Sequence, residues 1–373
     1  MNYLRTLLFV CLIQCSIVCI ACLGQSGRNC ASQSLLEDSL DKWQEYMESS
    51  ADGLWESQED HRVTITRRWE IGSEELIEPL FYDGYFIDVS GDTIVIADRA
   101  TQSLVCIDSS GSLLWRYGEE GEGPGHILGI GQMSIGDSAI AFVNSGLSYV
   151  DVISRDGRFL ERLSCVRNPQ CVRYVGSHGL AVLSKNEPGG DVHIVDVRSD
   201  SILFSLGDAS WEPGNAGDWS VYDLWCEFFP PDHLVYVSQY ESKIIICDLS
   251  DRTSICVPIR ELPFDVTEPE IEVTGGMLNG VYYPLLRSVF MGPEGEINVA
   301  VTNIRADGRM AGSSSTDRSL PFTVIDRYNL SGEYLSTYCL PDSDLLNISY
   351  DGEGYIAAMQ YGTGILFNYT LDE

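Results

Sequence analysis

Short apolar segments alternate with tight polar turns from about Gly84 to the C-terminus. Each turn is rich in Gly, Pro, Asn or Asp and is followed at once by a β-branched or aromatic run, a pattern typical of a strand that leaves a turn. The copies recur near the roughly 40–50 residue spacing of a four-stranded propeller blade. Six copies of this first turn are found, at Val89–Asp92, Ser134–Asp137, Gly176–Gly179, Pro230–His233, Gly292–Gly295 and Asp351–Gly354.

A second turn follows the third strand of each unit and leads into a fourth strand such as Leu113–Tyr117. One such unit is too small to bury its own apolar faces, so neighbouring units must pack on one another. The repeat therefore predicts an all-β fold, a six-bladed β-propeller over residues 61–373; a β-sandwich and an open β-solenoid remain as alternatives. The five copies of the second turn are Asp108–Gly111, Ser154–Gly157, Arg198–Ser201, Leu249–Arg252 and Asn329–Gly332.

The last unit ends after its third strand, and a candidate for the missing strand lies near the other end of the chain. The segment Arg62–Gly72 alternates like a strand, and its Trp69–Gly72 portion is similar to Trp115–Gly118. If it pairs with the last unit, the ring closes and no sheet edge is left between the first and last blades. The sequence thus predicts a propeller closed by an N-terminal strand.

One segment resembles a known family. Trp115–Ile127 is similar to the Gly-x-Gly-Pro-Gly-aromatic element that follows a blade's outer strand in six-bladed propellers of the NHL and TolB-like group, particularly in bacterial envelope lipoproteins. Ile127 departs from the pattern, because the group more often has Phe there. The resemblance implies the fold and is nearly silent on activity, since one fold hosts many functions.

Residues 1–22 have the organisation of a signal peptide, with an apolar stretch at Leu7–Ala21 that is too short to span a bilayer with margin. The segment Cys19–Cys22 resembles a bacterial lipobox with Cys22 as the lipid acceptor, although Cys19 occupies the position where Leu is usual. Ordinary cleavage near Gly24 and a retained anchor are the alternatives. Each outcome places the propeller outside the cytoplasm, in the cell envelope as a lipid-anchored or periplasmic protein or otherwise secreted. It meets a membrane only through a possible lipid anchor.

Residues 23–60 form a polar tether that contains a short predicted helix. Ser34–Glu37 makes a capping box, and Leu36, Leu40, Trp43 and Met47 recur at helical spacing. This pattern predicts a helix near residues 35–48 that precedes the propeller and packs on it.

The charge is strongly negative. The chain has 373 residues, of which 23 are Lys or Arg and 55 are Asp or Glu, for a formal net charge of −32. Such a surface repels nucleic acids and anionic membranes, so neither is an expected partner. The acidic residues are spread over loops and strand faces and therefore also suit a solubilising role.

An exported chain can oxidise its cysteines, of which there are 12. Cys247 and Cys256 flank one of the second turns, and Cys165 and Cys171 lie on either side of a connection between blades. Each pair is a candidate disulfide. The alternative is that they are buried free thiols that act as small apolar side chains.

Motifs for catalysis are absent from the sequence. The five histidines form no zinc-binding pair, and no nucleophile elbow precedes a helix. The Gly121–Gly125 segment lacks the Lys-Ser/Thr of a phosphate loop and is better explained as a hinge between blades. Asp98 and Glu241 follow second strands, where propeller lactonases place calcium ligands, but the six to eight oxygens that calcium needs cannot be assembled from the repeat. Hence no cofactor is predicted, and calcium is left open.

The longest loops all belong to one class. In a propeller, the interblade connections and the loops between second and third strands share one face, and the predicted long segments 118–126, 207–219, 260–283 and 303–320 are all of this kind. Long loops on a rigid scaffold are where binding usually resides. The candidate binding residues on or beside them are Arg99, His126, Trp211, Trp219, Arg305 and Arg309; the two tryptophans could instead pack their own loop.

Aromatic and cationic side chains together suit stacking on sugars or peptides and pairing with carboxylates. The sequence thus favours a non-enzymatic envelope propeller that binds a protein, peptide or glycan through its long-loop face. A calcium-dependent lactonase or related hydrolase working at the tunnel mouth is the alternative.

Overall fold

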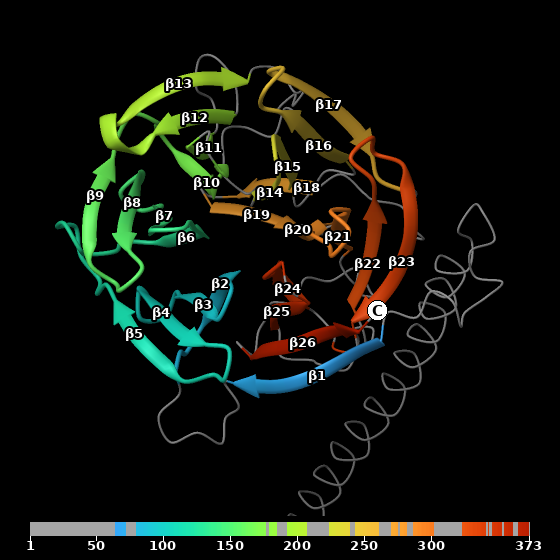
Figure 1. The fold of residues 1–373 in the computed structure, drawn as a ribbon. Helices are drawn as coiled ribbons and strands as arrows, with labels where there is room; N and C mark the ends of the chain where they lie inside the picture. Colours follow the sequence, from blue (N-terminus) through green and yellow to red (C-terminus); the bar gives the residue numbers. More distant parts are fainter. Residues whose placement is uncertain are drawn as a thin grey trace, which may run out of the picture.

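A computed structural model describes residues 64–71, 80–176, 179–184, 192–206, 224–238, 243–260, 270–274, 277–281, 286–301, 323–340, 342, 345–352, 354–360 and 365–372. In these residues the chain forms six four-stranded sheets arranged as blades around one axis (Figure 1). The predicted all-β, six-bladed propeller is confirmed. The signal peptide, Cys22 and the predicted helix at 35–48 lie outside the described residues.

Each blade begins with an inner strand at the axis and ends with an outer strand at the rim (Figure 1). Blade 1 contains β2 (Gly84–Ser90), β3 (Thr93–Asp98), β4 (Ser103–Asp108) and β5 (Leu113–Tyr117); blade 2 contains β6 (Ile130–Ile135), β7 (Ala139–Asn144), β8 (Tyr149–Ser154) and β9 (Phe159–Leu163); blade 3 contains β10 (Pro169–Tyr174), β11 (Leu180–Ser184), β12 (Val192–Asp196) and β13 (Ser201–Leu206). Blade 4 contains β14 (Leu224–Phe229), β15 (His233–Ser238), β16 (Lys243–Asp248) and β17 (Thr253–Pro258); blade 5 contains β20 (Leu286–Met291), β21 (Ile297–Val301), β22 (Thr323–Tyr328) and β23 (Tyr334–Leu340); blade 6 contains β24 (Leu345–Tyr350), β25 (Tyr355–Gln360), β26 (Leu366–Asp372) and β1 (Thr64–Ile71). A 3-10 turn, η3 (Val197–Ser199), precedes β13.

The ring closes as predicted, because β1 supplies the outer strand of blade 6. It pairs antiparallel with β26 from Thr64 opposite Asp372 to Ile71 opposite Leu366. In Figure 1 the blue N-terminal strand lies beside the red C-terminal one. The closure is therefore held by hydrogen bonds and packing between the two ends of the chain.

The apolar core lies between the blades. Six clusters of buried side chains are found, one at each interface between neighbouring blades. The cluster between blades 1 and 2, for example, contains the fully buried side chains of Val95, Leu104, Ile140 and Phe142. Both faces of a blade are buried in this way, which explains the nearly continuous apolar runs of the second and third strands.

The second turn of each blade joins its third and fourth strands and packs against the preceding blade. Each of the five turns places one residue in the left-handed region, namely Gly111, Gly157, Asp200, Arg252 and Gly332. Gly157 lies against the Trp115 ring of β5, which a Cβ atom would approach to 3.0 Å. At the corresponding place in blade 4, the Arg252 guanidinium lies 4.5 Å from the Phe204 ring of β13. These contacts fix neighbouring blades relative to one another at the rim.

The two faces of the ring carry different kinds of strand connection. We call the face with the interblade connections and the loops between second and third strands the interblade face, and the opposite one the turn face. The two kinds of loop meet on the first of these, where the Gly129 amide donates to Gln102 Oε1 at 2.7 Å.

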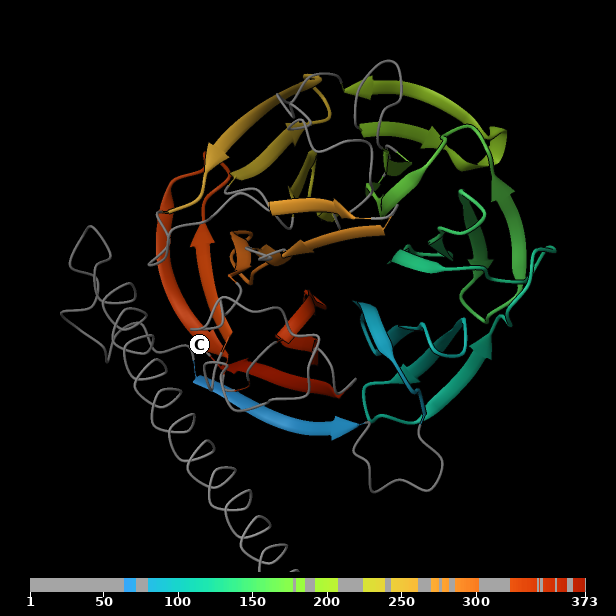
Figure 2. The ribbon, with the colours of Figure 1, turned by 180° about the vertical axis from the view of Figure 1, so that it is seen from behind.

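The connection from β17 to β20 contains a β-hairpin where a long loop was predicted. Strands β18 (Glu270–Thr274) and β19 (Met277–Val281) pair as an antiparallel hairpin, from Glu270 opposite Val281 to Thr274 opposite Met277. Because it belongs to an interblade connection, the hairpin lies on the interblade face, and in Figures 1 and 2 it projects over the middle of the ring. In the described residues, no helix has the length and hydropathy needed to cross a membrane.

Candidate functional site

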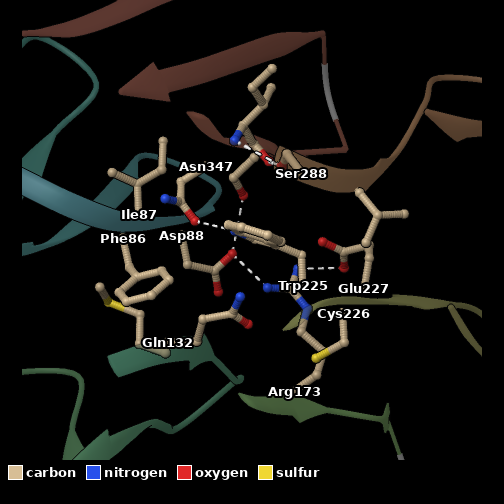
Figure 3. Close-up of a pocket in the computed structure, with 14 residues that line it drawn as sticks. Phe86, Ile87, Asp88, Gln132, Arg173, Trp225, Cys226, Glu227, Ser288 and Asn347 are labelled. Atoms are coloured by element: carbon tan, nitrogen blue, oxygen red, sulfur yellow. Dashed lines mark hydrogen bonds and ion pairs between the residues drawn. The ribbon is translucent and has the colours of Figure 1, made fainter. Parts of the chain in front are cut away.

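A pocket in the central channel is lined by side chains from the inner strands of all six blades (Figure 3). Its volume is about 30 Å³, enough for one or two water molecules. Its lining residues are Phe86, Ile87, Asp88, Gln132, Met133, Arg173, Trp225, Cys226, Glu227, Ser288, Val289, Asn347, Ile348 and Ser349.

Three charged residues form a buried group in the channel, which we call the Arg173 triad (Asp88, Arg173 and Glu227). Arg173 Nη1 of β10 lies 2.8 Å from Asp88 Oδ1 of β2, and its Nη2 donates to Glu227 Oε1 of β14. The triad therefore joins the inner strands of blades 1, 3 and 4, as Figure 3 shows. Asp88 also accepts hydrogen bonds from the Ile135 amide at 2.6 Å and from Ser349 Oγ at 3.1 Å, which connects it to blades 2 and 6.

The environment of the triad changes the proton affinity of its members. Burial raises the pKa of Glu227 to about 7, against the lowering effect of Arg173. Burial also works to lower the pKa of Arg173, but Asp88 and Glu227 outweigh it, so the pKa of the guanidinium is raised. The Arg173 guanidinium therefore keeps its positive charge, while the Glu227 carboxyl titrates near neutral pH.

This titration makes stability depend on pH. Between pH 4.5 and pH 7 the Glu227 carboxyl is protonated in the folded protein. In the unfolded chain its pKa has the ordinary value of 4.5, so the proton has already been released. We therefore expect the free energy of unfolding to fall by about 1–3 kcal/mol as the pH rises from 4.5 to 7 and then to level off. Glu227→Gln should remove this part of the pH dependence, as measured by urea unfolding at several pH values.

Glu119→Gln is the matched control, because the Glu119 side chain is 81% exposed. It should leave the pH profile unchanged. A Glu227→Gln profile that is as steep as that of the native protein would contradict the assignment.

Two further interactions join inner strands at the axis. Trp225 Nε1 of β14 donates to Asn347 Oδ1 of β24 at 2.7 Å, which joins blade 4 to blade 6 across the axis. The Gln132 side-chain amide of β6 donates to the Leu224 carbonyl and joins blade 2 to blade 4. Since these contacts run between blades that are not neighbours, they brace the ring from within.

A disulfide adds a covalent link at the same level. Cys171 of β10 is bonded to Cys226 of β14, so blades 3 and 4 are joined through their inner strands. This corrects the predicted pairs: Cys165, Cys247 and Cys256 are free thiols. Cys247 of β16 lies opposite Ser254 of β17, and Cys256 lies opposite Ile245. The two cysteines are therefore two positions out of register on their adjacent strands. Burial raises the pKa of Cys165 and Cys247 to about 12. Cys247 is fully buried and packs as a small apolar group, whereas the partly buried Cys165 thiol also interacts with Asp200.

On the interblade face, buried Asp98 organises an exposed group of side chains. Its two carboxylate oxygens accept hydrogen bonds from the Tyr82, Asp83 and Ala100 amides and from Thr101 Oγ1, at 2.8–3.1 Å. These four donors come from the entry into β2 and from the loop between β3 and β4. Asp98 therefore fixes two loops relative to each other, and its oxygens are engaged by protein groups rather than free for calcium.

The loops that Asp98 holds carry an exposed aromatic ring and an exposed cation. Tyr82 is 65% exposed. Arg99 lies 3.9 Å above the Tyr85 ring and 3.2 Å from the Asp83 carboxylate, with its side chain 44% exposed. We call Tyr82, Asp83, Tyr85 and Arg99 the Tyr82 cluster. It contains one residue that the sequence singled out, Arg99, and two aromatic residues that it did not.

His126 lies in the connection from β5 to β6, on the same face. Its ring packs on the glycines of its own loop, and a Cβ at Gly121 would lie 2.7 Å from its Nδ1. Its carbonyl accepts a hydrogen bond from Asn144 Nδ2 at 3.0 Å. The segment around it is thus the hinge between blades that the sequence indicated, and His126 stabilises the hinge. Trp211, Trp219, Arg305, Arg309 and Glu241 lie outside the described residues.

A metal centre finds no support in the part of the chain that is described. No group of three or more His, Cys, Asp or Glu side chains is placed there to hold a metal ion. The carboxylates that lie deepest, Asp88 and Glu227, are instead paired with Arg173.

Comparison with known proteins identifies the fold alone. No protein-family model and no curated protein matches the chain. Among solved structures, a DUF4221 family member from Bacteroides vulgatus has a TM-score of 0.55 at 10% identity, covering 83% of this chain and 98% of its own. A Bacteroides fragilis protein named as exported has a TM-score of 0.51 at 12% identity, with 83% and 96% covered. A Bacteroides thetaiotaomicron protein of unknown function has a TM-score of 0.54 at 10% identity, with 83% and 76% covered.

Proposed function

We propose that this chain is an exported, non-enzymatic propeller of the NHL and TolB-like kind, held at the cell envelope by a lipid on Cys22. Its interblade face binds a protein, peptide or glycan. The Tyr82 cluster is the observation that carries this proposal, because it combines an exposed ring, an exposed cation and a rigid support.

Rigidity matters for binding because side chains that are already ordered lose little entropy when a ligand arrives. Asp98 ties the two loops beneath the Tyr82 cluster with four hydrogen bonds. Exposed tyrosine and arginine are also the residue types that contribute most at binding surfaces. A sugar ring or a peptide side chain can stack on Tyr82, while Arg99 offers its guanidinium to an acceptor group.

The interactions at the axis also support binding at the surface. The Arg173 triad, Trp225 and Gln132 are engaged in ion pairs and hydrogen bonds between the inner strands, whereas the Tyr82 cluster is exposed on the interblade face. The lactonase alternative gains no support. Asp98 is the described residue at the expected calcium position, and its carboxylate oxygens accept hydrogen bonds from four protein donors.

Export rests on two supports. The first is the signal-peptide pattern and lipobox of residues 1–22. The second is the structural similarity to a Bacteroides fragilis protein named as exported. Both the envelope location and the lipid anchor are part of the proposal.

Variants of the Tyr82 cluster test the proposal directly. The probe is a set of soluble peptidoglycan fragments, which combine sugar rings with a short peptide, and binding is measured by calorimetry. We expect Tyr82→Ala and Arg99→Ala each to weaken binding by about tenfold or more. Because both side chains are substantially exposed, the melting temperature should change little.

Arg158→Ala is the matched control. Arg158 is an exposed arginine paired with Asp156 next to a second turn, so it lies on the turn face. It should bind the fragments as the native protein does. Equal binding by all three variants, or no binding by the native protein, would overturn the assignment of this ligand to this face.

A further inference from the structure

Among the described residues, the outer strand of each blade pairs with a neighbour on one side only, and five of these six strands carry a β-bulge. In each bulged strand one extra residue has no partner on the neighbouring strand; these residues are Arg68, Leu114, Leu160, Leu203 and Leu335. A bulge twists a strand and interrupts its hydrogen-bonding edge, which is one way in which proteins prevent edge-to-edge association. The repeat therefore protects its rim at the same place in five blades.

Strand β17 of blade 4 is the exception. Its six residues pair with β16 without any register shift, from Thr253 opposite Asp248 to Pro258 opposite Lys243. It also contains no charged residue, with the sequence Thr-Ser-Ile-Cys-Val-Pro. In both views of the ring β17 lies at the outer boundary (Figures 1 and 2). Blade 4 thus presents a regular, neutral strand edge.

Strand β17 also exposes an apolar side chain and a thiol to solvent. Ile255 is 48% exposed, and Cys256 beside it is an exposed free thiol. Regular strands with exposed apolar side chains and no charge are the ones that recruit another strand. Pro258 has no amide hydrogen and ends the usable edge, which leaves Thr253–Val257 for pairing.

The charge of the chain indicates which strand this edge accepts. Two copies with a net charge of −32 repel one another over most of their surface, so they can approach only through a neutral region. An antiparallel strand pairs with its own copy about a two-fold axis, and such an interface is self-complementary. Centred on Ile255, this pairing would place Thr253 opposite Val257 and bring no charged side chains together within the strands.

We infer that β17 is a self-association edge, through which two copies of this chain join their fourth blades into a continuous eight-stranded antiparallel sheet. The interface lies at the rim and leaves the interblade face of each copy open. It is therefore independent of the proposed ligand binding.

Sedimentation velocity of the purified mature protein over a range of concentrations tests this inference. The native protein should dimerise. Ile255→Lys places two like charges across the two-fold axis and should weaken the dimer by about tenfold or more. Leu160→Lys is the matched control, because Leu160 is 53% exposed on the bulged strand β9, and it should leave dimerisation unchanged.

A native protein that stays monomeric, or a Leu160→Lys variant that dissociates as readily as Ile255→Lys, would overturn the inference. Circular dichroism checks that the variants fold. If Ile255→Lys does not fold, a short bis-maleimide supplies the test, because Cys256 lies close to the axis. Native protein should then give a covalent dimer that Cys256→Ser does not give, and a product that forms equally in both proteins would contradict a β17 interface.

Discussion

Replacing Arg173 with Leu should lower the free energy of unfolding by about 3–5 kcal/mol. The substitution leaves Asp88 and Glu227 facing each other in the channel, where Asp88 is 1% and Glu227 8% exposed. Glu227 can escape part of this cost by taking up a proton, because burial already raises its pKa to about 7. The loss should therefore be larger at pH 8 than at pH 5, which urea unfolding at the two pH values measures.

Arg158→Leu is the control for this variant. Its ion pair with Asp156 lies 3.1 Å apart at the surface, with the Arg158 side chain 82% exposed. Exposed pairs contribute little, so the change should stay within about 0.5 kcal/mol. Similar losses in the two variants would show that the Arg173 triad does not hold the inner strands together.

Removing the disulfide should have the second large effect. The bond closes a segment of 55 residues between Cys171 and Cys226, and in the chain-entropy account a loop of this size stabilises the folded state by about 4 kcal/mol. We expect the Cys171→Ser, Cys226→Ser double variant to unfold at correspondingly lower urea concentration. It should also lack the response to reductant that we expect of the native protein.

Cys256→Ser provides the comparison, because Cys256 is an exposed free thiol outside the disulfide. Its stability and its response to reductant should match those of the native protein in the monomeric state. A native protein whose unfolding is the same with and without reductant would contradict the Cys171–Cys226 bond.

The repeat made most of the fold predictable from the sequence. Turns recurred with the same residue types at the same places, and the copy that lacked a fourth strand indicated that Arg62–Gly72 would close the ring. The strand β1 does so. The hairpin β18–β19 was missed, because a single irregular insertion has no second copy with which to compare it.

The channel was harder to predict, since its interactions join residues far apart in the sequence. Arg173 meets Asp88 across 85 positions and Glu227 across 54. A signal was nevertheless available: each is the only charged residue of its inner strand, and Asp88 and Arg173 both occupy the fifth position of that strand. The abundance of carboxylates elsewhere in the chain hid it.

The same comparison of repeats would have found the disulfide. Cys171 and Cys226 are both the third residue of an inner strand, in neighbouring blades. The pairs chosen for their nearness in sequence were wrong for two reasons: Cys247 and Cys256 lie on adjacent strands but out of register, and Cys171 is bonded to Cys226 of the next inner strand rather than to Cys165. Position within the repeat, rather than distance along the chain, decides which side chains meet at the axis.

The axis of the ring is structural, whereas the interblade face is proposed to bind. Ion pairs and hydrogen bonds at the axis brace the ring, while the Tyr82 cluster offers an exposed, prearranged surface on the interblade face. Hydrogen exchange of the mature protein, with and without saturating peptidoglycan fragments, tests this division most directly. We predict protection of residues 82–85 and 99–102, with no change at the turn-face segments 108–111 and 154–157. Protection confined to the turn face, or to the inner strands of the channel, would contradict it.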